Sequence, residues 1–297
     1  MNTGPHVPPP VEHPRKPRLR LPAGACDSHV HVYGPVARFP FAAERPYTPP
    51  DASLERLWAL YGLLGISRAV YVQATVHGYD NAAILDAIAR DPSRGRGVAL
   101  VRTDIEPDAL RALHAQGIRG VRFNFVRHLG NPPDIDAVLR LSERIAPMGW
   151  HVQLHFGAQD LLEQRGLLQR LQSTYVIDHM GRTPAADGLR QEACLTLLDV
   201  LADERAWIKL SGPERLTARS SRDAGFAYED VVPFARQLMA AAPQRCVWGT
   251  DWPHPNVREM PDDGDLVDLI GHYTDTAGMR DLLVHNPERL YGFEPHH

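Results

Sequence analysis

With 297 residues, of which 43% are hydrophobic and 23% charged, the chain has the length and composition of one ordinary globular domain. Its formal net charge of −4 argues against the strongly basic surface of a typical nucleic-acid-binding protein, and no apolar run is long enough to span a bilayer. The three cysteines are scattered and odd in number, and no apolar signal segment is present at the start, so we expect reduced thiols and a cytoplasmic protein.

The first 22 residues, MNTGPHVPPPVEHPRKPRLRLP, are rich in proline and basic residues and offer little to bury. We expect them to form either a mobile tail or an extended strap over the folded domain. Residues 23–297 are then predicted to form a single domain.

From residue 23 onward, strand-like segments alternate with helix-like segments whose apolar residues recur at three- and four-residue spacing. Strands are predicted at Cys26–Tyr33, Ala69–Ala74, Gly97–Val101, Gly120–Phe125, His151–Phe156, Tyr175–Asp178, Trp207–Leu210 and Cys246–Gly249. Helices are predicted at Ser53–Leu64, Asn81–Arg90, Pro107–Gln116, Ile135–Met148 and Glu192–Ala202, with Asp51 or Ser53 as the first N-cap and Gly117 as a stop.

Eight strands that alternate with helices predict an α/β fold in which a parallel sheet closes into a (β/α)8 TIM barrel. An open doubly wound sheet is the alternative, but no G-x-G-x-x-G follows the first strand. Two long irregular segments, Phe39–Pro50 and Pro213–Tyr228, follow the first and seventh strands. Loops in that position build the active sites of such barrels, so we expect both to be functional.

Histidines and one aspartate stand where predicted strands end. In the first strand, which ends DSHVH, alternation puts His29 and His31 on one face. Two such imidazoles can share a metal ion or an anionic ligand, although chance alone could produce a His-x-His in a chain with 15 histidines. Other strands deliver polar residues to the same end of the barrel: His155 from the fifth, His179 from the sixth and Asp251 from the eighth. This convergence predicts an active site there.

The fourth strand, GVRFNF, places Arg122 and Asn124 on one face and apolar residues on the other. An arginine that points into a barrel needs an anion, because a buried unpaired charge is very costly. Recognition of a substrate carboxylate is one interpretation, and a structural salt bridge is the other. Arg127 and Arg215 are further candidates for an anion pocket, with an ordinary surface role as the alternative for each.

Taken together, these motifs resemble the amidohydrolase superfamily. More narrowly, DSHVHVYGP, RPYTP, GVRFNFV, VIDHMGR, IKLSG and WGTDWPHPN resemble the 2-pyrone-4,6-dicarboxylate lactonases and the related sugar-acid lactonases and lactone isomerases. The resemblance implies that Asp251 is the general base for water and that His29, His31 and His179 surround the lactone carbonyl. It also implies that Arg122 and Arg215 bind substrate carboxylates. Tyr47 and Thr75 match substrate-contacting hydroxyls, and the predicted substrate-binding set is completed by Asn124, Arg127, His155 and His254.

Two departures from the family bear on substrate and cofactor. The pyrone lactonases have an arginine near the position of His128, which weakens the case for a dicarboxylate unless Arg127 replaces it, and a tyrosine at the position of His155. The gained histidine completes a possible ligand set of His29, His31, His155 and Asp251 for one divalent ion, zinc or manganese, with Gly249 leaving room beneath it. The alternative is metal-free chemistry, as in the pyrone lactonases.

We therefore predict a hydrolase that opens the ester bond of a small anionic lactone with water activated by Asp251. A lactone isomerase would use a substrate hydroxyl in place of water, and a decarboxylase of the same superfamily would use a single metal ion. A non-catalytic binding protein on a barrel scaffold is the alternative from another class. No pattern in the sequence specifies an oligomeric state.

Overall fold

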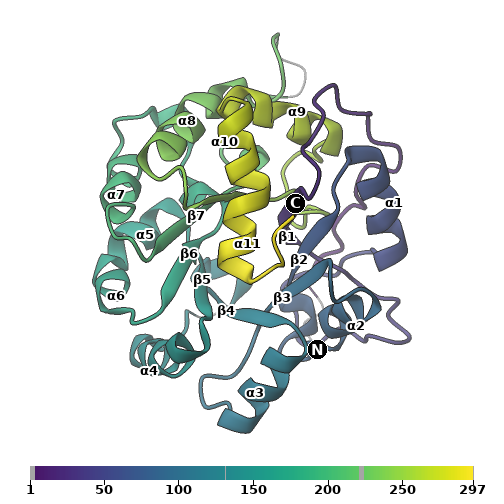
Figure 1. Ribbon diagram of the computed structural model, residues 1–297, viewed down its shortest axis with the longest axis vertical. Helices are drawn as coiled ribbons and strands as arrows, with labels where there is room; N and C mark the ends of the chain where they lie inside the picture. Colours follow the sequence, from purple (N-terminus) through teal and green to yellow (C-terminus); the bar gives the residue numbers. More distant parts are fainter. Residues whose placement is uncertain (1–3, 131, 221–223, 297) are drawn as a thin grey trace.

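The computed structural model describes residues 4–130, 132–220 and 224–296, and its sheet confirms the predicted (β/α)8 barrel (Figure 1). Eight strands lie in sequence order, and each is parallel to the next. They are β1 Cys26–Val30, β2 Arg68–Val72, β3 Gly95–Ala99, β4 Ile118–Asn124, β5 His151–His155, β6 Thr174–Ile177, β7 Ala206–Leu210 and β8 Cys246–Trp248.

Helices surround this sheet, and the predicted ones are present within a few residues of their expected ends. They are α1 Leu54–Leu64, α2 Ala82–Arg90, α3 Pro107–Ala115, α4 Ile135–Ile145, α5 Ala158–Glu163, α6 Arg165–Arg170, α7 Glu192–Val200, α8 Val232–Ala241, α9 Asp263–Tyr273, α10 Thr276–Arg280 and α11 Asn286–Tyr291. Ser53 is the N-cap of α1, since its hydroxyl accepts from the Arg56 N–H. Gly117 follows α3 with φ +94°, a left-handed conformation that favours glycine.

The N-terminal end of the barrel is closed by the last helix, which crosses in front of the strands in Figure 1. Leu290, Tyr291 and Phe293 form one buried apolar cluster with strand residues such as Cys26 and Val70. This packing leaves the opposite end, where the strands end, for the functional site.

Backbone hydrogen bonds close the barrel between β8 and β1. The Asp251 N–H donates to the His29 carbonyl, and the His31 N–H donates to the Trp252 carbonyl, each at 2.8 Å. The predicted first strand extended to Tyr33, but β1 ends at Val30 because the chain turns there to bond with the segment after β8.

A buried carboxylate stabilises the same junction between β8 and β1, which we call the seam. Asp27 Oδ1 accepts from the backbone N–H groups of His29 and Thr250, at 3.0 Å each. Its Oδ2 accepts from the hydroxyls of Thr250 at 2.6 Å and Tyr61 at 2.9 Å. Gly249 permits this close approach, since a Cβ there would lie 2.5 Å from the His29 nitrogen. The space beside Gly249 is thus filled by β1, and the expectation that it leaves room for an ion or a water is wrong.

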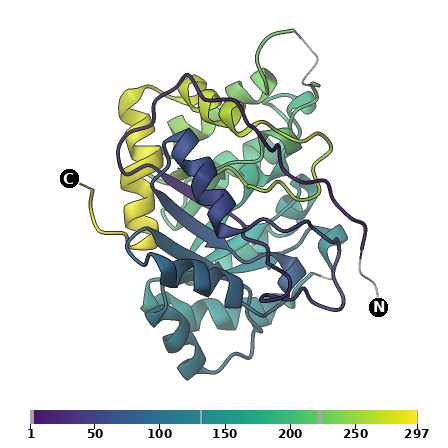
Figure 2. The ribbon, with the colours of Figure 1, turned by 90° about the vertical axis from the view of Figure 1, so that its right-hand side faces the viewer.

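Residues 4–22 form an extended strap along the outside of the barrel (Figure 2). The Val7 N–H donates to the Thr48 carbonyl at 3.1 Å, beside the predicted site residue Tyr47. Further along, Arg15 pairs with Asp265 at 2.5 Å and with Asp268 at 2.7 Å. The strap therefore connects the loop after β1 to helix α9.

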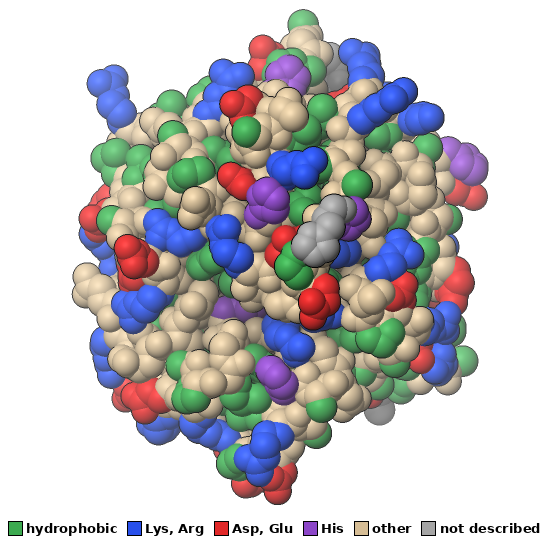
Figure 3. Space-filling model, viewed as in Figure 1, with side chains coloured by type: hydrophobic (Ala, Val, Ile, Leu, Met, Phe, Trp, Pro, Cys, Tyr) green, Lys and Arg blue, Asp and Glu red, His purple; other side chains and the backbone are tan. Residues whose placement is uncertain are grey.

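Acidic and basic side chains are interspersed over the face shown in Figure 3. Among the described helices, none combines the length and the apolar character that a membrane crossing requires.

Candidate active site

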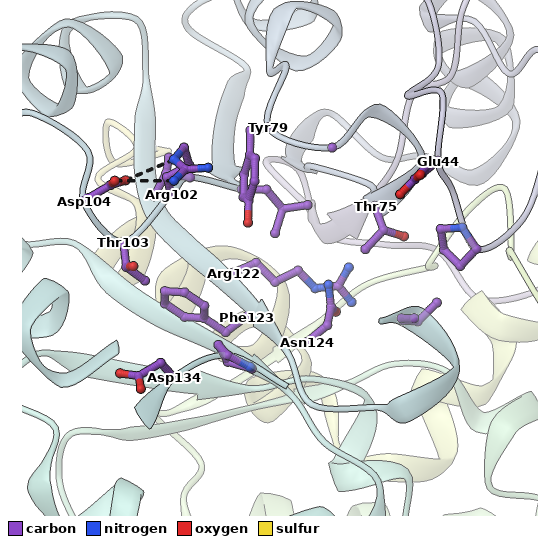
Figure 4. Close-up of a pocket in the computed structure, with 16 residues that line it drawn as sticks. Glu44, Thr75, Tyr79, Arg102, Thr103, Asp104, Arg122, Phe123, Asn124 and Asp134 are labelled. Carbon is purple, nitrogen blue, oxygen red and sulfur yellow. Dashed lines mark hydrogen bonds and ion pairs between the residues drawn. The ribbon is translucent and has the colours of Figure 1, made fainter. Parts of the chain in front are cut away.

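Two hollows that share lining residues lie at the end of the barrel where the strands terminate. The inner one, of about 30 Å³, is lined by His31, Tyr47, Thr75, Arg122, Leu129, His155, His179, Arg182, Arg215, Asp251, Pro255 and Asn256. The outer one, of about 540 Å³, shares Thr75, Arg122 and Leu129 with it. Figure 4 shows Thr75, Arg122 and Asn124 together at this outer cavity. The outer hollow therefore has the size of a small-ligand site, whereas the inner one has room for only about one or two waters beside Asp251.

Asp251 is the centre of the inner site. Its Oδ2 accepts from Arg215 Nη2 at 2.5 Å, while its Oδ1 lies 3.2 Å from His31 Nε2, 3.5 Å from His29 Nε2 and 3.9 Å from His179 Nε2. Burial raises the pKa of this carboxyl, but the Arg215 guanidinium and the hydrogen bond from His31 outweigh burial and hold it well below its usual range. Asp251 is thus an ionised carboxylate in the ligand-free site.

Three of the predicted histidines are oriented through their Nδ1 atoms, and their Nε2 atoms are left to face the site. The Nδ1 partners are the Val72 carbonyl for His31 at 2.8 Å, Ser211 Oγ for His179 at 2.9 Å and Asn124 Oδ1 for His155 at 3.1 Å. Burial lowers the pKa of His179 to about 3 and that of His155 well below its ordinary value. These two rings are therefore neutral at physiological pH.

Within the described part of the chain, one group of side chains has the spacing of a metal site. The candidate donor atoms of His29, His179 and Asp251 all lie within 4.8 Å of one another. Two imidazole nitrogens and one carboxylate oxygen are a donor set that suits zinc or another first-row divalent ion. The predicted set differed, since it contained His31 and His155 in place of His179. The ring of His155 stands edge-on to that of His179, with centroids 5.3 Å apart, and is not one of the converging groups.

Beneath the site lies a buried polar layer formed by Arg122, Gln153, Asp178 and Lys209. Of these residues, only Arg122 was predicted from the sequence. Arg122 Nε donates to Asp178 Oδ2 at 3.0 Å, and Gln153 Nε2 donates to the same oxygen at 3.1 Å. Lys209, from the middle of β7, donates to Gln153 Oε1 at 2.7 Å. Burial raises the pKa of Asp178, but the nearby cations Arg122 and Lys209 bring it well below the ordinary value. The structural salt bridge considered for Arg122 is therefore present, although the same side chain also lines both hollows.

The strand pattern contained a signal for this layer. In the seventh strand, WIKL, alternation places Lys209 on the face opposite Ile208 and Leu210. Asp178 follows the sixth strand directly, one residue before His179. A polar residue in or directly after an otherwise apolar barrel strand is therefore the sequence signal for both members of this layer.

A third cationic group of the inner hollow, Arg182, was also missed. It ends the short turn His179–Arg182, in which His179, Met180 and Arg182 all have φ near +50°. Burial, together with Arg215, lowers the pKa of Arg182 to about 10, so it still carries a charge at neutral pH. The inner hollow therefore contains three guanidinium groups, those of Arg122, Arg182 and Arg215.

Two predicted substrate-binding residues are not among those that line either hollow. Arg127 is exposed at the start of the short turn Arg127–Leu129. His254 is buried, and its Nε2 lies 3.0 Å from Asp263 Oδ1 at the start of α9. A direct role of either residue in substrate binding stays a prediction. The side chain of His128 lies outside what the structure describes.

Fold and site together define a barrel with histidines and an aspartate at the strand ends, and comparison with known families agrees. The family model for Amidohydrolase matches residues 26–293, so the chain belongs to the amidohydrolase family.

Two curated relatives are similar over most of their length. The chain is 47% identical to a 2-pyrone-4,6-dicarboxylate hydrolase of Comamonas testosteroni, over 94% of this chain and 93% of the relative. It is 39% identical to a 4-sulfomuconolactone hydrolase of Rhizobium radiobacter, over 92% and 91% respectively. Among solved structures, it is similar to a probable 2-pyrone-4,6-dicarboxylic acid hydrolase from Acinetobacter baumannii with citric acid bound. That match has a TM-score of 0.78 and 26% identity, and it covers 91% of this chain and 100% of the other.

Proposed function

We propose that this chain hydrolyses the ester bond of a small lactone that carries one or more acidic groups. The observation that supports this best is the environment of Asp251: an ionised carboxylate beside three imidazoles, in a hollow with three arginines. The relatives named above act on lactones with carboxylate or sulfonate groups, according to their names, which agrees with an anion-binding hollow of this kind.

In the proposed reaction, Asp251 takes a proton from water while the water oxygen attacks the lactone carbonyl carbon. Imidazole N–H groups stabilise the negative charge that develops on the carbonyl oxygen, and the tetrahedral intermediate then collapses. The ring C–O bond breaks, and the leaving oxygen receives the proton that Asp251 took. The products are a carboxylic acid, which ionises by releasing the second proton of the water to solvent, and a hydroxyl or enol on the same open chain.

The anionic groups of the substrate bind to arginines in this proposal. Guanidinium groups match carboxylates geometrically and keep their charge at all working pH values. Arg215 already holds Asp251, so it can position both the base and a substrate anion, while Arg122 and Arg182 are available from the other walls. Tyr47 and Thr75 add hydroxyls to the same hollow.

The reaction described above uses no metal ion. As the alternative, we propose that the same site binds one divalent ion, zinc or manganese, as a cofactor. His29, His179 and Asp251 are the residues that would hold it, because their donor atoms converge. Such an ion would polarise the lactone carbonyl and make water more acidic.

We also propose a cytoplasmic location with reduced thiols, since Cys26, Cys194 and Cys246 are all buried and unpaired.

The test is an assay of the purified chain with 2-pyrone-4,6-dicarboxylate and with its neutral dimethyl ester. We expect loss of the pyrone absorbance for the acid, a product heavier by one water, and little reaction with the ester. An isomer of unchanged mass would favour the isomerase alternative, and carbon dioxide release would favour the decarboxylase. Failure to open any acidic lactone, with or without added zinc or manganese, would contradict the proposal.

A further inference from the structure

Lys209 is fully buried inside the barrel, and two oxygens and one imidazole nitrogen lie within hydrogen-bond distance of its Nζ. Its Nζ lies 2.9 Å from the Ser28 carbonyl, 2.7 Å from Gln153 Oε1 and 3.3 Å from His29 Nδ1. An ammonium group has three N–H donors and no acceptor, so each donor has one partner here. Only Lys16 and Lys209 are lysines in a chain with 32 basic residues, which shows how rarely this sequence uses the compact ammonium.

The neighbours of Lys209 determine the direction of each hydrogen bond. Asp178 Oδ2 can only accept, so the amide nitrogen of Gln153 faces it at 3.1 Å, and the amide oxygen faces Lys209. The other carboxylate oxygen, Asp178 Oδ1, lies 3.3 Å from His29 Nδ1 and 3.6 Å from Lys209 Nζ. Within the described residues it makes no hydrogen bond, whereas the contact of Lys209 with His29 has the geometry of one.

We propose that Lys209 is a positioning residue that donates to His29 Nδ1 and thereby keeps the ring proton of His29 on Nε2. That Nε2 has no hydrogen-bond partner in the described chain, and it faces Asp251 Oδ1 at 3.5 Å. If the chain hydrolyses lactones as proposed above, His29 Nε2–H then donates to the lactone carbonyl oxygen, where negative charge develops.

The same hydrogen bond bears on metal binding. A histidine that binds a metal usually donates its other ring N–H to a carboxylate, a carbonyl or a water. His31 has that arrangement, because its Nδ1 contacts the Val72 carbonyl. For His29 a carboxylate oxygen, Asp178 Oδ1, and the Lys209 ammonium both lie 3.3 Å from Nδ1. An ammonium can only donate, so when Lys209 donates to Nδ1 that nitrogen cannot donate to Asp178. By spacing, His29 belongs to a possible metal site, but its tautomer suits hydrogen-bond donation. Lys209 therefore favours hydrogen-bond donation by His29 over metal binding by His29.

Nitrogen NMR of histidine-labelled protein tests this directly, since protonated and unprotonated ring nitrogens have well-separated shifts. The His29 signals are assigned by their loss in His29→Gln. We expect the ligand-free wild-type protein to carry the proton on Nε2 of His29. A proton on Nδ1 with Nε2 free would overturn the inference. This measurement needs neither a substrate nor a Lys209 variant, so its result is independent of whether the chain hydrolyses lactones.

Lys209→Met removes the donor at similar side-chain length. Without Lys209, the ring proton of His29 should move from Nε2 to Nδ1, where it can be donated to Asp178 Oδ1. The NMR signals should then report a protonated Nδ1 and an unprotonated Nε2. We also expect kcat to fall about 100-fold, the usual effect of losing one donor to a developing oxyanion, with a smaller change in KM. Zinc affinity, measured by titration calorimetry, should rise relative to wild type. Lys16→Met, in the strap, is the matched control and should change none of these values. An unchanged His29 tautomer in a folded Lys209→Met protein would refute the role of Lys209.

Discussion

At the seam between β8 and β1, backbone hydrogen bonds beyond the two strand ends fix where Asp251 and His31 lie, whereas on the wall formed by β4 to β6 the polar side chains are oriented by one another. The Asp251 N–H and the His31 N–H each bond across the seam at 2.8 Å. On the other wall, the strands have their own backbone bonds, and within them the side chain of Arg122 bonds to that of Asp178 and the ring of His155 bonds to the side chain of Asn124.

We infer from this difference that the seam provides the reactive base and that the β4–β6 wall recognises the substrate. A base acts only within hydrogen-bond distance of the proton it removes, so a position fixed through the backbone suits Asp251. A binding wall built from side chains can exchange an internal partner for a substrate group. The relatives illustrate the point, because their names indicate different lactones in similar barrels. We therefore expect substitutions at the seam to lower kcat and substitutions on the β4–β6 wall to change substrate preference.

The largest effect is expected for Asp251→Asn. The amide keeps the size and the backbone bonds of the residue but cannot take a proton from water, so kcat should fall by about two to four orders of magnitude. Turnover of an acidic lactone and the midpoint of thermal unfolding are the two measurements. A folded variant with near-normal turnover would show that another group is the base.

Arg122→Met tests the binding wall. A carboxylate that loses its guanidinium partner should bind more weakly, so KM for an acidic lactone should rise about 10- to 100-fold, from the strength of charge-assisted hydrogen bonds. KM for a neutral lactone should change much less. Equal losses on the two substrates would mean that the bond to Asp178 is the main role of Arg122.

Asp27→Asn weakens the seam without touching the site directly. The amide can still accept, but it loses the charge that the hydroxyls of Thr250 and Tyr61 contact. We expect a loss of about 1–3 kcal/mol in the free energy of unfolding, measured in urea, and a fall in kcat of about tenfold with KM nearly unchanged. Thr250→Val, which removes one of these hydroxyl contacts, should have a smaller effect in the same direction. A changed substrate preference would contradict the assignment of the seam to reactivity.

The smallest effect is expected for His155→Tyr on zinc binding. Because His155 is outside the converging donor group, its replacement should leave zinc affinity within about twofold, whereas loss of a true ligand such as His179 in His179→Asn should lower it at least tenfold. Both affinities come from titration calorimetry of chelator-treated protein. If His155→Tyr abolishes zinc binding, the ligand set predicted from sequence is the correct one.

The sequence by itself determined the barrel, the family and most of the residues that reach the inner hollow. Strand alternation is a local property with a period of two, so it correctly directed Arg122 inward and brought His29, His31 and Asp251 to one end. It also predicted eight strands, all of which are present within a few residues of their expected ends.

Only the tertiary structure decided which of these side chains meet. The alternation of polar and apolar residues along a strand indicates which side chains face the barrel axis. The distance between two such side chains depends on the register and twist of all the strands between them. Arg215 therefore paired with Asp251, and His179 took the place expected for His155 beside it. The proton position on His29 depends on Lys209, 180 residues away in the chain, because a hydrogen bond across the barrel requires that β7 and β1 first be brought together.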